Sequence, residues 1–556
     1  MTRTRLRTRG YALTLAAAVA GATLAGGLIG PTLLGSQVEG EVHQRLREYT
    51  DLLDAAAQWA PERLETEELV YSSIDGMIRT LDPHSSFLAP RAYSEMQDRQ
   101  KGSFYGLGIL VTKRNNQVTV ITPLEGTPAS RLGIRAGDII AEVEDEPTDE
   151  MSLDDVVSRL KGAKGTPVNI KIKRVGIEEM IPMTIIREAI PTNSISYALM
   201  LGPDVGYIRI KDFTRTTVRE LDESVAKLRA AGMKKLLLDL RSNPGGLLDA
   251  AVGVTDHFVE KGDMIVYTRG RTPDSFQEFR APGTHMRLNV PLVVLINRGS
   301  ASASEIIAGA VQDHDRGLVI GTTSWGKGLV QSVYTLQYGA GLALTTSKYF
   351  TPAGRNIQRD YTSVYDYYVA DGSGRLLDEV DLSEREVFLT NTGRKVYGGG
   401  GITPDVIVEP RELSRTLQLL EVRSTIFNFG VDYYSRHPEL NRDMKVTPAI
   451  VEEFIAFADK REIAPGEDVR EAIVDPADRT WLERALQAEI IAAKFGFDAS
   501  YPYRLRGDDQ VSRALQLFPE AEKLAARAAA ARSEMLAREE RGSTSPSTAS
   551  GIPKSQ

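Results

Sequence analysis

The residues best spaced for nucleophilic chemistry are three serines and one lysine. The serines lie in the run Asn297–Glu305, between a strand predicted over Leu292–Ile296 and a helix predicted over Ser304–Gln312. A serine in such a turn lies at the positive end of a helix, where backbone N–H groups can stabilise a developing oxyanion. The same serines could instead simply cap the helix. Lys327 lies between two glycines after the next predicted strand of the same α/β region, and this favours the catalytic interpretation.

Two other motifs match catalytic signatures less well. Ser158–Lys161 has the S-x-x-K spacing of penicillin-binding proteins, but neither S-D-N nor K-T-G accompanies it. Gly321–Gly328 reads G-x-x-x-x-G-K, but Gly328 stands where a phosphate loop needs Ser or Thr to hold magnesium. Asp239, which would have to be the magnesium carboxylate, precedes the loop instead of following it. We therefore expect neither S-x-x-K catalysis nor nucleotide hydrolysis.

The composition excludes several other chemistries. The chain has 556 residues, 42% of them hydrophobic, and no cysteine, so disulfides, thiolate nucleophiles and iron–sulfur clusters are ruled out. With 67 basic and 75 acidic side chains, the formal net charge of −8 lacks the basic surplus of a nucleic-acid binder. The histidines are scattered and form no H-E-x-x-H motif, so we expect no metal site and no other cofactor. They are His43, His84, His257, His285, His314 and His437.

The N-terminus combines an arginine cluster with a long uncharged segment. Arginine occupies every second position from Arg3 to Arg9, and Tyr11–Leu34 contains no charged residue and is long enough to span a bilayer. We expect residues 1–36 to form a signal anchor with the arginines in the cytoplasm. The abundance of Ala and Gly leaves a cleaved signal peptide as the alternative. Either form would carry the rest of the chain across a membrane.

Residues 37–96 are predicted to be helical, because apolar side chains recur at spacings of three and four. The segment contains an Asp82-Pro83 turn, in which we interpret His84 as a turn or packing residue.

Residues 97–178 contain short strands, tight glycine turns and a predicted helix, and they resemble a PDZ domain. The predicted peptide-binding residues are Gly106, Leu107, Gly108 and Ile109. Backbone N–H groups beside these glycines can form a nest for a terminal carboxylate, while the exposed strand edge accepts a peptide as an added strand. An ordinary glycine turn in a β-rich module is the alternative.

The remainder of the chain divides into three segments. Residues 179–412 alternate apolar strands with helices, which predicts an α/β core. Residues 413–541 are predicted to be a helical extension, with a solvated or partner-packing helix that begins after Pro519 and runs to Glu540. Residues 542–556 are rich in Ser, Thr, Pro and Gly and lack the apolar surface needed to fold.

Five motifs, in this order along the chain, resemble those of the carboxyl-terminal processing peptidases, also called tail-specific proteases. They are Gly76–Ser85, Asp239–Gly246, Gly299–Glu305, Trp325–Gln331 and Gly399–Asp405. The resemblance covers about residues 38 to 410. It implies an α/β fold with a crotonase/ClpP-like protease core and an inserted PDZ domain, flanked by N- and C-terminal helical regions and an N-terminal membrane segment.

The resemblance also assigns roles to individual residues. It implies that Ser302 is the nucleophile, that Lys327 is the general base and that Gln331 orients the lysine. Backbone N–H groups of Gly246 and Ala303 are implied to form the oxyanion hole. The chain is thereby identified as a serine endopeptidase that recognises protein C-termini through its PDZ domain. The alternative is a non-catalytic, membrane-tethered PDZ scaffold, which the presence of all three catalytic side chains disfavours.

A lysine base places requirements on its surroundings. Lysine has an ordinary pKa of ~10.4 and must be neutral to accept the Ser302 proton. A dry pocket beneath apolar strands lowers a lysine pKa, because burial disfavours the ammonium. We also expect Gln331 to accept a hydrogen bond from Lys327 only if Gly328–Val330 turn, since four extended residues span about 13 Å.

The resemblance implies protein substrates with apolar C-terminal tails as partners. The N-terminal segment adds the membrane, and the C-terminal helices, which lie outside the resemblance, could bind a second copy or an adaptor protein. The expected location is the bacterial cell envelope, with the chain anchored in the inner membrane and its catalytic part in the periplasm. If the signal is cleaved, the protein is secreted to the periplasm.

Overall fold

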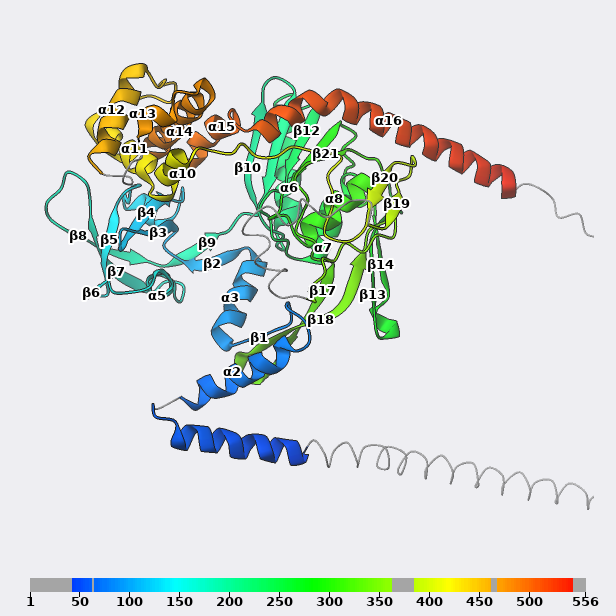
Figure 1. Cartoon of the computed structure of the whole chain (residues 1–556), viewed down its shortest axis with the longest axis horizontal. Coiled ribbons are helices and arrows are strands. Elements are labelled where there is room, and N and C mark those ends of the chain that lie inside the picture. Colours follow the sequence, from blue (N-terminus) through cyan, green and yellow to red (C-terminus); the bar gives the residue numbers. More distant parts are fainter. Residues whose placement is uncertain (1–42, 63–64, 363–384, 462–467, 544–556) are drawn as a thin grey trace, which may run out of the picture.

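The computed structural model describes residues 43–62, 65–362, 385–461 and 468–543 (Figure 1). Within these ranges no helix is both long and apolar enough to cross a membrane. The predicted membrane segment, Tyr11–Leu34, lies outside them, as do residues 544–556 of the predicted tail. The described chain is a mixed α/β protein, as the sequence predicts.

A six-stranded sheet forms the centre of the core, in the order β10-β11-β12-β15-β16-β21. All neighbouring strands are parallel except the edge pair β10 and β11. The inner strands are mostly apolar, as expected where both faces of a parallel sheet are covered, and every residue of β15 is fully buried. The strands are β10 (Ile195–Leu201), β11 (Val205–Ile210), β12 (Lys235–Asp239), β15 (Leu292–Ile296), β16 (Leu318–Gly321) and β21 (Val406–Ile407).

Helices cover both faces of this sheet. One face packs against α6, α7 and α8, and the other packs against α15 and α16 from the C-terminal extension. Side chains alternate between the two cores, with Leu236 and Leu238 in the first and Leu237 in the second. Figure 1 shows α16 running along the sheet and beyond it. The helices are α6 (Thr217–Ala230), α7 (Leu248–Asp256), α8 (Ala303–Asp313), α15 (Phe497–Leu505) and α16 (Asp509–Ser543).

The predicted start of the last helix is wrong. Helix α16 begins at Asp509 and continues through Pro519, although a proline inside a helix removes one backbone hydrogen bond. Leu517, Phe518 and Ala521, on either side of the proline, are buried against the sheet, and this burial stabilises the uninterrupted helix. The first half of α16 therefore belongs to the core and is not merely solvated.

A second sheet connects the N-terminal region to the core. Its order is β1-β18-β13-β14, with β17 also paired to β18. Strand β17 follows directly after the Gly326–Gly328 segment, so this sheet positions Lys327. The elements are β1 (Ser86–Leu88), β13 (Met264–Gly270), β14 (Gln277–Arg280), β17 (Leu329–Thr335) and β18 (Gly341–Phe350), with the helix at residues 43–59, α2 (Thr66–Arg79), α3 (Pro90–Lys101), and the hairpin of β19 (Val387–Leu389) and β20 (Lys395–Tyr397).

The segment that resembles a PDZ domain folds around a core of its own. Its sheet has the order β3-β4-β5-β7-β8, with β6 paired to β5, so β3 is an edge strand. A ribbon of β2 and β9 connects this unit to the rest of the chain. The elements are β2 (Ser103–Gly106), β3 (Ile109–Arg114), β4 (Gln117–Pro123), α4 (Pro128–Arg131), β5 (Ile139–Val143), β6 (Glu146–Pro147), α5 (Leu153–Leu160), β7 (Pro167–Lys173), β8 (Ile181–Ile186) and β9 (Glu188–Pro191).

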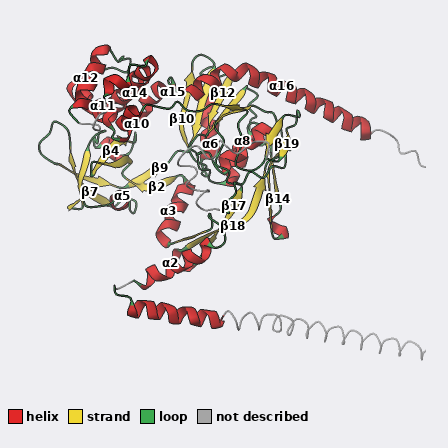
Figure 2. Ribbon diagram, in the orientation of Figure 1, coloured by secondary structure: helices red, strands yellow, loops and turns green. Residues whose placement is uncertain are grey.

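The C-terminal extension begins with a bundle of helices, seen as a group beside β4 in Figure 2. The bundle has its own apolar core. It contacts the β3–β4 unit where the Arg114 guanidinium lies 4.1 Å from the centre of the Phe427 ring. The helices are α10 (Arg415–Val422), α11 (Thr425–Arg436), α12 (Pro448–Asp459), α13 (Val469–Ala472) and α14 (Pro476–Phe495).

The packing of α16 can be tested with two leucines of the same helix. Leu517 is 1% exposed and Leu515 is 39% exposed. We expect Leu517→Ala to lower the free energy of unfolding by about 2–5 kcal/mol, because it leaves a cavity against the sheet. Leu515→Ala should change it by no more than about 0.5 kcal/mol. Chemical denaturation measures both values, and equal effects would contradict the placement of α16 on the sheet.

Candidate active site

Ser302 lies where β15 ends and α8 begins, in a strained backbone conformation. Its φ of 54° and ψ of −112° are angles that residues other than glycine rarely adopt. Two contacts hold it there: its N–H donates to Glu305 Oε2 at 2.7 Å, and its carbonyl accepts from Tyr349 Oη at 3.1 Å. The strained residue therefore lies at the positive end of α8.

The other two serines of the run make structural contacts. Ser300 Oγ donates to Leu240 O at 2.8 Å, and Ser304 Oγ donates to Asn243 O at 3.0 Å. Both side chains are fully buried, and their bonds join the serine loop to the glycine-rich loop after β12. Ser302 is partly exposed and lines a cavity. Of the three hydroxyls, that of Ser302 is the one placed to meet a substrate.

The loop after β12 brings two glycines against Ser302. The Phe213 N–H donates to Gly245 O at 3.0 Å and holds the loop in place. Gly246 has a φ of +149°, and a Cβ there would lie 2.1 Å from Phe213 O, so only glycine fits. A Cβ on Gly245 would lie 2.8 Å from Ser302 Cβ. On the other side of Ser302, Ala303 is the first residue of α8, and its N–H has no acceptor within the helix.

Lys327 lies in the loop between β16 and β17, where its charged form is disfavoured. Burial lowers the pKa of Lys327 below that of an ordinary lysine, against the opposing attraction of Glu305 and Asp82. Its Nζ donates to Gln331 Oε1 at 3.0 Å. The Gln331 Nε2 donates in turn to the carbonyl oxygen of His84. Lys327 is thus a partly buried amine held in one orientation.

The expectation that Gln331 could reach Lys327 only across a turn is wrong. Both Val330 and Gln331 belong to strand β17, and yet the contact is made. The pairing of β17 with β18 shifts between these two residues, and the residue left out of the register, Thr346, belongs to β18. The side chains of Lys327 and Gln331 are long enough to meet across the extended segment. The expectation had counted only the backbone length of about 13 Å and not the reach of these side chains.

Glu305 is a functional residue to which the sequence analysis gave no role. Its fully buried carboxylate accepts hydrogen bonds from the N–H groups of Ser302, Gly326 and Lys327 at 2.7, 2.7 and 2.9 Å, and from Ser324 Oγ at 2.5 Å. Burial raises the pKa of Glu305, although these four donors favour its ionised form. The carboxylate thus joins the loop of the candidate nucleophile to that of the candidate base. A Glu three residues after a serine that begins a helix is a capping-box pattern, which was the available signal.

The Asp82-Pro83 turn lies beside Gln331, which binds Lys327. Asp82 accepts the N–H groups of His84 and Ser85, both at 2.8 Å, which fixes the turn. Burial and the nearby Lys327 lower the pKa of His84 to about 4, so its imidazole is neutral at neutral pH. Through its backbone carbonyl, His84 supports the glutamine that holds the lysine.

A cavity of about 590 Å³ brings the predicted catalytic residues together. Its lining includes Ser302, Lys327, Gln331, Gly246 and Ala303. Much of the remaining wall is apolar, with Met96, Leu247, Leu248, Ile306 and Leu329. Among the described residues, Ser302 Oγ and Lys327 Nζ are not hydrogen-bonded to each other, which is common in unliganded sites. A hydroxyl at a helix N-terminus and an amine of lowered pKa in one cavity can perform acyl transfer.

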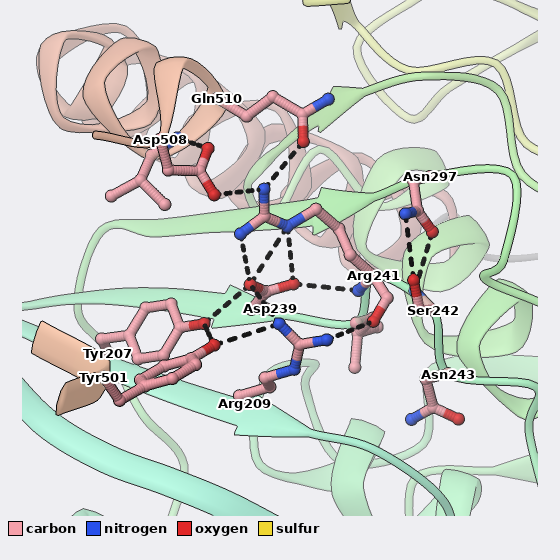
Figure 3. A network of polar contacts seen from close by, with 12 residues as sticks. Tyr207, Arg209, Asp239, Arg241, Ser242, Asn243, Asn297, Tyr501, Asp508 and Gln510 are labelled. Carbon is pink, nitrogen blue, oxygen red and sulfur yellow. Dashed lines mark hydrogen bonds and ion pairs between the residues drawn. The ribbon is translucent and has the colours of Figure 1, made fainter. Parts of the chain in front are cut away.

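The C-terminal extension contacts the loop beside this cavity through a buried network of charges (Figure 3). Asp239, at the end of β12, accepts from Arg241 Nη2 and from Tyr207 Oη, both at 2.7 Å. Arg241 Nη1 binds Asp508 at 2.7 Å and Gln510 at 2.8 Å. Burial opposes ionisation of Asp239, but the Arg241 guanidinium outweighs it and lowers the pKa of this carboxyl. Asp239 is therefore engaged with arginine and is not placed to bind magnesium.

The four residues predicted to bind peptide lie where β2 leads into β3. Gly106 ends β2, and Ile109 begins the edge strand β3. Leu107 is buried, and its carbonyl accepts from the Ala129 N–H at 3.0 Å. Gly108 has a φ of +77°. The structure therefore places a fixed glycine turn at the open edge of this sheet.

Comparison with known proteins gives two family matches. Residues 204–365 match peptidase family S41, and residues 119–174 match the PDZ domain. The chain is 39% identical over 324 residues to the carboxy-terminal-processing protease of Bartonella bacilliformis, covering 58% of this chain and 74% of the relative. It is 36% identical over 304 residues to the carboxyl-terminal-processing protease of Synechocystis sp., covering 53% and 70%. The solved photosystem II D1 C-terminal processing protease aligns with a TM-score of 0.34 and 28% identity, covering 65% of this chain and 86% of that one.

The contact between Lys327 and Gln331 can be tested with two Gln331 variants of similar shape and different charge, by measuring the pKa of Lys327. We expect Gln331→Glu to raise the pKa of Lys327 by about 1–3 units, because a carboxylate beside the ammonium stabilises the charged form. Competitive labelling of the Lys327 amine across a pH series measures this pKa. Gln331→Met, which is neutral, should not raise it, and equal values in the two variants would contradict the contact.

Proposed function

Because this chain belongs to peptidase family S41 and is a PDZ-containing serine protease of the carboxyl-terminal-processing kind, we propose that Ser302 and Lys327 are its catalytic dyad. The observation that carries the proposal is their arrangement: a strained serine at a helix N-terminus and a buried amine of lowered pKa line one cavity. A crotonase/ClpP-like core is part of the same proposal, supported by the parallel strands with helices between them.

In the proposed acylation step, neutral Lys327 accepts the proton of Ser302 Oγ as this oxygen attacks the carbonyl carbon of the scissile peptide bond. The N–H groups of Gly246 and Ala303 donate to the developing oxyanion. The tetrahedral intermediate then loses the amine as the C–N bond breaks, and the Lys327 ammonium returns the proton to this leaving group. In deacylation Lys327 takes a proton from a water molecule as this water attacks the acyl carbon. It returns that proton to Ser302 Oγ as the ester C–O bond breaks and the new carboxyl group leaves.

Gln331 and Glu305 have positioning roles in this mechanism. The Gln331 amide accepts from Lys327 Nζ and so directs the amine. Glu305 binds the backbone N–H groups of both dyad residues and so sets the separation of their loops. Neither side chain exchanges a proton with substrate.

The proposed substrate is a protein with an apolar C-terminal tail. The apolar part of the cavity wall suits an apolar side chain next to the scissile bond. The open β3 edge and the turn Gly106–Ile109 would hold the free C-terminus, with the carboxylate at the backbone N–H groups and the tail paired as an added strand.

The location and assembly of the protein remain part of the proposal. The uncharged Tyr11–Leu34 segment after the arginines supports export across the bacterial inner membrane, either with an anchor or after cleavage of a signal peptide. The mass of the mature N-terminus distinguishes the two forms. A second copy or an adaptor at the C-terminal helices is proposed on the length of α16 that extends beyond the sheet (Figure 1).

The dyad can be tested by proteolysis of a protein that ends in an apolar tail. We expect Ser302→Ala and Lys327→Ala each to lower kcat by roughly 10⁴-fold or more, as loss of a nucleophile or its base does in other serine proteases. The rate for wild type should rise with pH through a pKa below that of an ordinary lysine, because only the neutral amine accepts the proton. Equal cleavage by wild type and both variants would reject the dyad and favour a scaffold.

The peptide-binding turn can be tested with two glycines of positive φ. A Cβ on Gly108 would lie 2.3 Å from Thr127 Cβ, whereas a Cβ on Gly126, with a φ of +74°, would meet nothing within 4 Å. We expect Gly108→Ala to weaken binding of an apolar C-terminal peptide by at least about tenfold, which corresponds to about 1.4 kcal/mol. Gly126→Ala should change it little. Fluorescence anisotropy in the Ser302→Ala background measures both, and equal affinities would exclude the turn from the binding site.

A further inference from the structure

Two histidines and an aspartate meet outside the catalytic cavity. Asp222 lies on α6, His257 is the C-terminal capping residue of α7, and His285 lies between β14 and β15. Each offers one possible ligand atom, and these three atoms lie within 4.8 Å of one another. Because the three residues are far apart in the sequence, the spacing of the histidines did not predict this cluster.

The hydrogen bonds of His257 direct a lone pair at Asp222. Its Nδ1 lies 2.9 Å from the carbonyl oxygen of Gly253, and because a carbonyl only accepts, Nδ1 must carry the hydrogen. In a neutral imidazole Nε2 is then an acceptor. This Nε2 lies 2.9 Å from Asp222 Oδ1, which also only accepts when ionised. The two acceptors need a cation between them, which is either a second proton on His257 or a metal ion.

The position of His285 favours the metal ion. Its Nδ1 lies 3.7 Å from Asp222 Oδ2, so two imidazoles face one carboxylate. The two rings stack, with centroids 4.6 Å apart and planes at 16°. The His257 side chain is 2% exposed and lies against the second ring, so the cluster is partly enclosed. A metal ion binds both rings in their neutral form.

The surroundings hold the His257 ring and the backbone that carries His285. Asp256, which is buried, accepts the N–H groups of Gly283, Thr284 and His285 at 2.8, 3.0 and 3.2 Å and so fixes the backbone that carries one ring. The carbonyl bonded to His257 Nδ1 fixes the other ring. Histidines that bind metals typically have such an outer hydrogen-bond partner. The cluster is therefore a supported arrangement rather than a chance meeting of surface side chains.

We propose that Asp222, His257 and His285 bind Zn²⁺. Two imidazole nitrogens and one carboxylate oxygen are donors typical of zinc sites, whereas Mg²⁺ and Ca²⁺ take oxygen ligands. The side chains of Asp222 and His285 are 49% and 26% exposed, so water can reach a fourth coordination position. Rotation of these two partly exposed side chains brings the ligand atoms to coordination distance.

The ion would connect two helices that begin at the catalytic loops. Helix α6 follows the Phe213 segment, and α7 follows Gly246. Helix α7 has 9 residues, about 13 Å at 1.5 Å per residue, and His257 lies at its far end. The ion is thus too distant to touch the reacting atoms. It stabilises the packing of α6 on α7, and thermal stability rather than chemistry depends on it.

Zinc titration of the chelator-treated full-length chain tests the proposal. We expect one Zn²⁺ to bind, measured by calorimetry, and the melting temperature to rise when Zn²⁺ is present. His285→Ala and Asp222→Asn, at partly exposed positions, should each weaken binding by at least about 10- to 100-fold, the loss seen when only an outer partner is removed. His437→Ala removes a histidine from the C-terminal helices and should bind Zn²⁺ like wild type.

Cobalt replacement reports on the ligands directly. We expect the Co²⁺-loaded wild type and His437→Ala to show the visible absorption of a four-coordinate site, and His285→Ala to lack it. Equal Zn²⁺ affinity in wild type, His285→Ala and Asp222→Asn would overturn the proposal and assign the contact between His257 and Asp222 to a second proton. The absence of any zinc-dependent rise in the wild-type melting temperature would also overturn it.

Discussion

The geometry of the catalytic site depends on one buried carboxylate, that of Glu305. It accepts the N–H groups of Ser302 and Lys327, which belong to separate loops. Separating the loops would leave a buried charge without partners, at a cost of several kcal/mol. The same negative charge attracts the Lys327 ammonium, and the pKa of this lysine is nevertheless lowered because desolvation outweighs that attraction. The four donors around the carboxylate favour its ionised form against the burial that raises its pKa.

Three distant parts of the chain support this one site. The His84 carbonyl of the N-terminal turn accepts from Gln331, and the central sheet carries the loops of Ser302 and Lys327. The C-terminal extension covers the opposite face of that sheet, and Asp508 binds Arg241 at the entrance of the glycine-rich loop. The peptidase core is therefore completed by helices that follow it in sequence, although the match to the peptidase family ends at residue 365.

Predictions from the sequence succeeded where they rested on local spacing. They failed where burial against distant parts of the chain determines the local structure. The strand and helix on either side of Ser302 were predicted because their apolar patterns are continuous. The continuation of α16 through Pro519 was not, since the stabilising burial is against strands far away in sequence. The pairing of His257 with His285 was missed for the same reason, because motif spacing detects only ligands that lie close along the chain.

The sequence by itself determined the available chemistry, because a chain without cysteine must use hydroxyl, amine and carboxylate groups. Its ordered motifs predicted Ser302 and Lys327 among them. Only the tertiary structure decided which hydroxyl is accessible. Ser300 and Ser304 bind carbonyls 60 and 61 positions away, and a contact at that separation exists only once the strands have paired. It also decided the direction in which the pKa of Lys327 shifts, because the burial that disfavours the ammonium exists only in the folded chain.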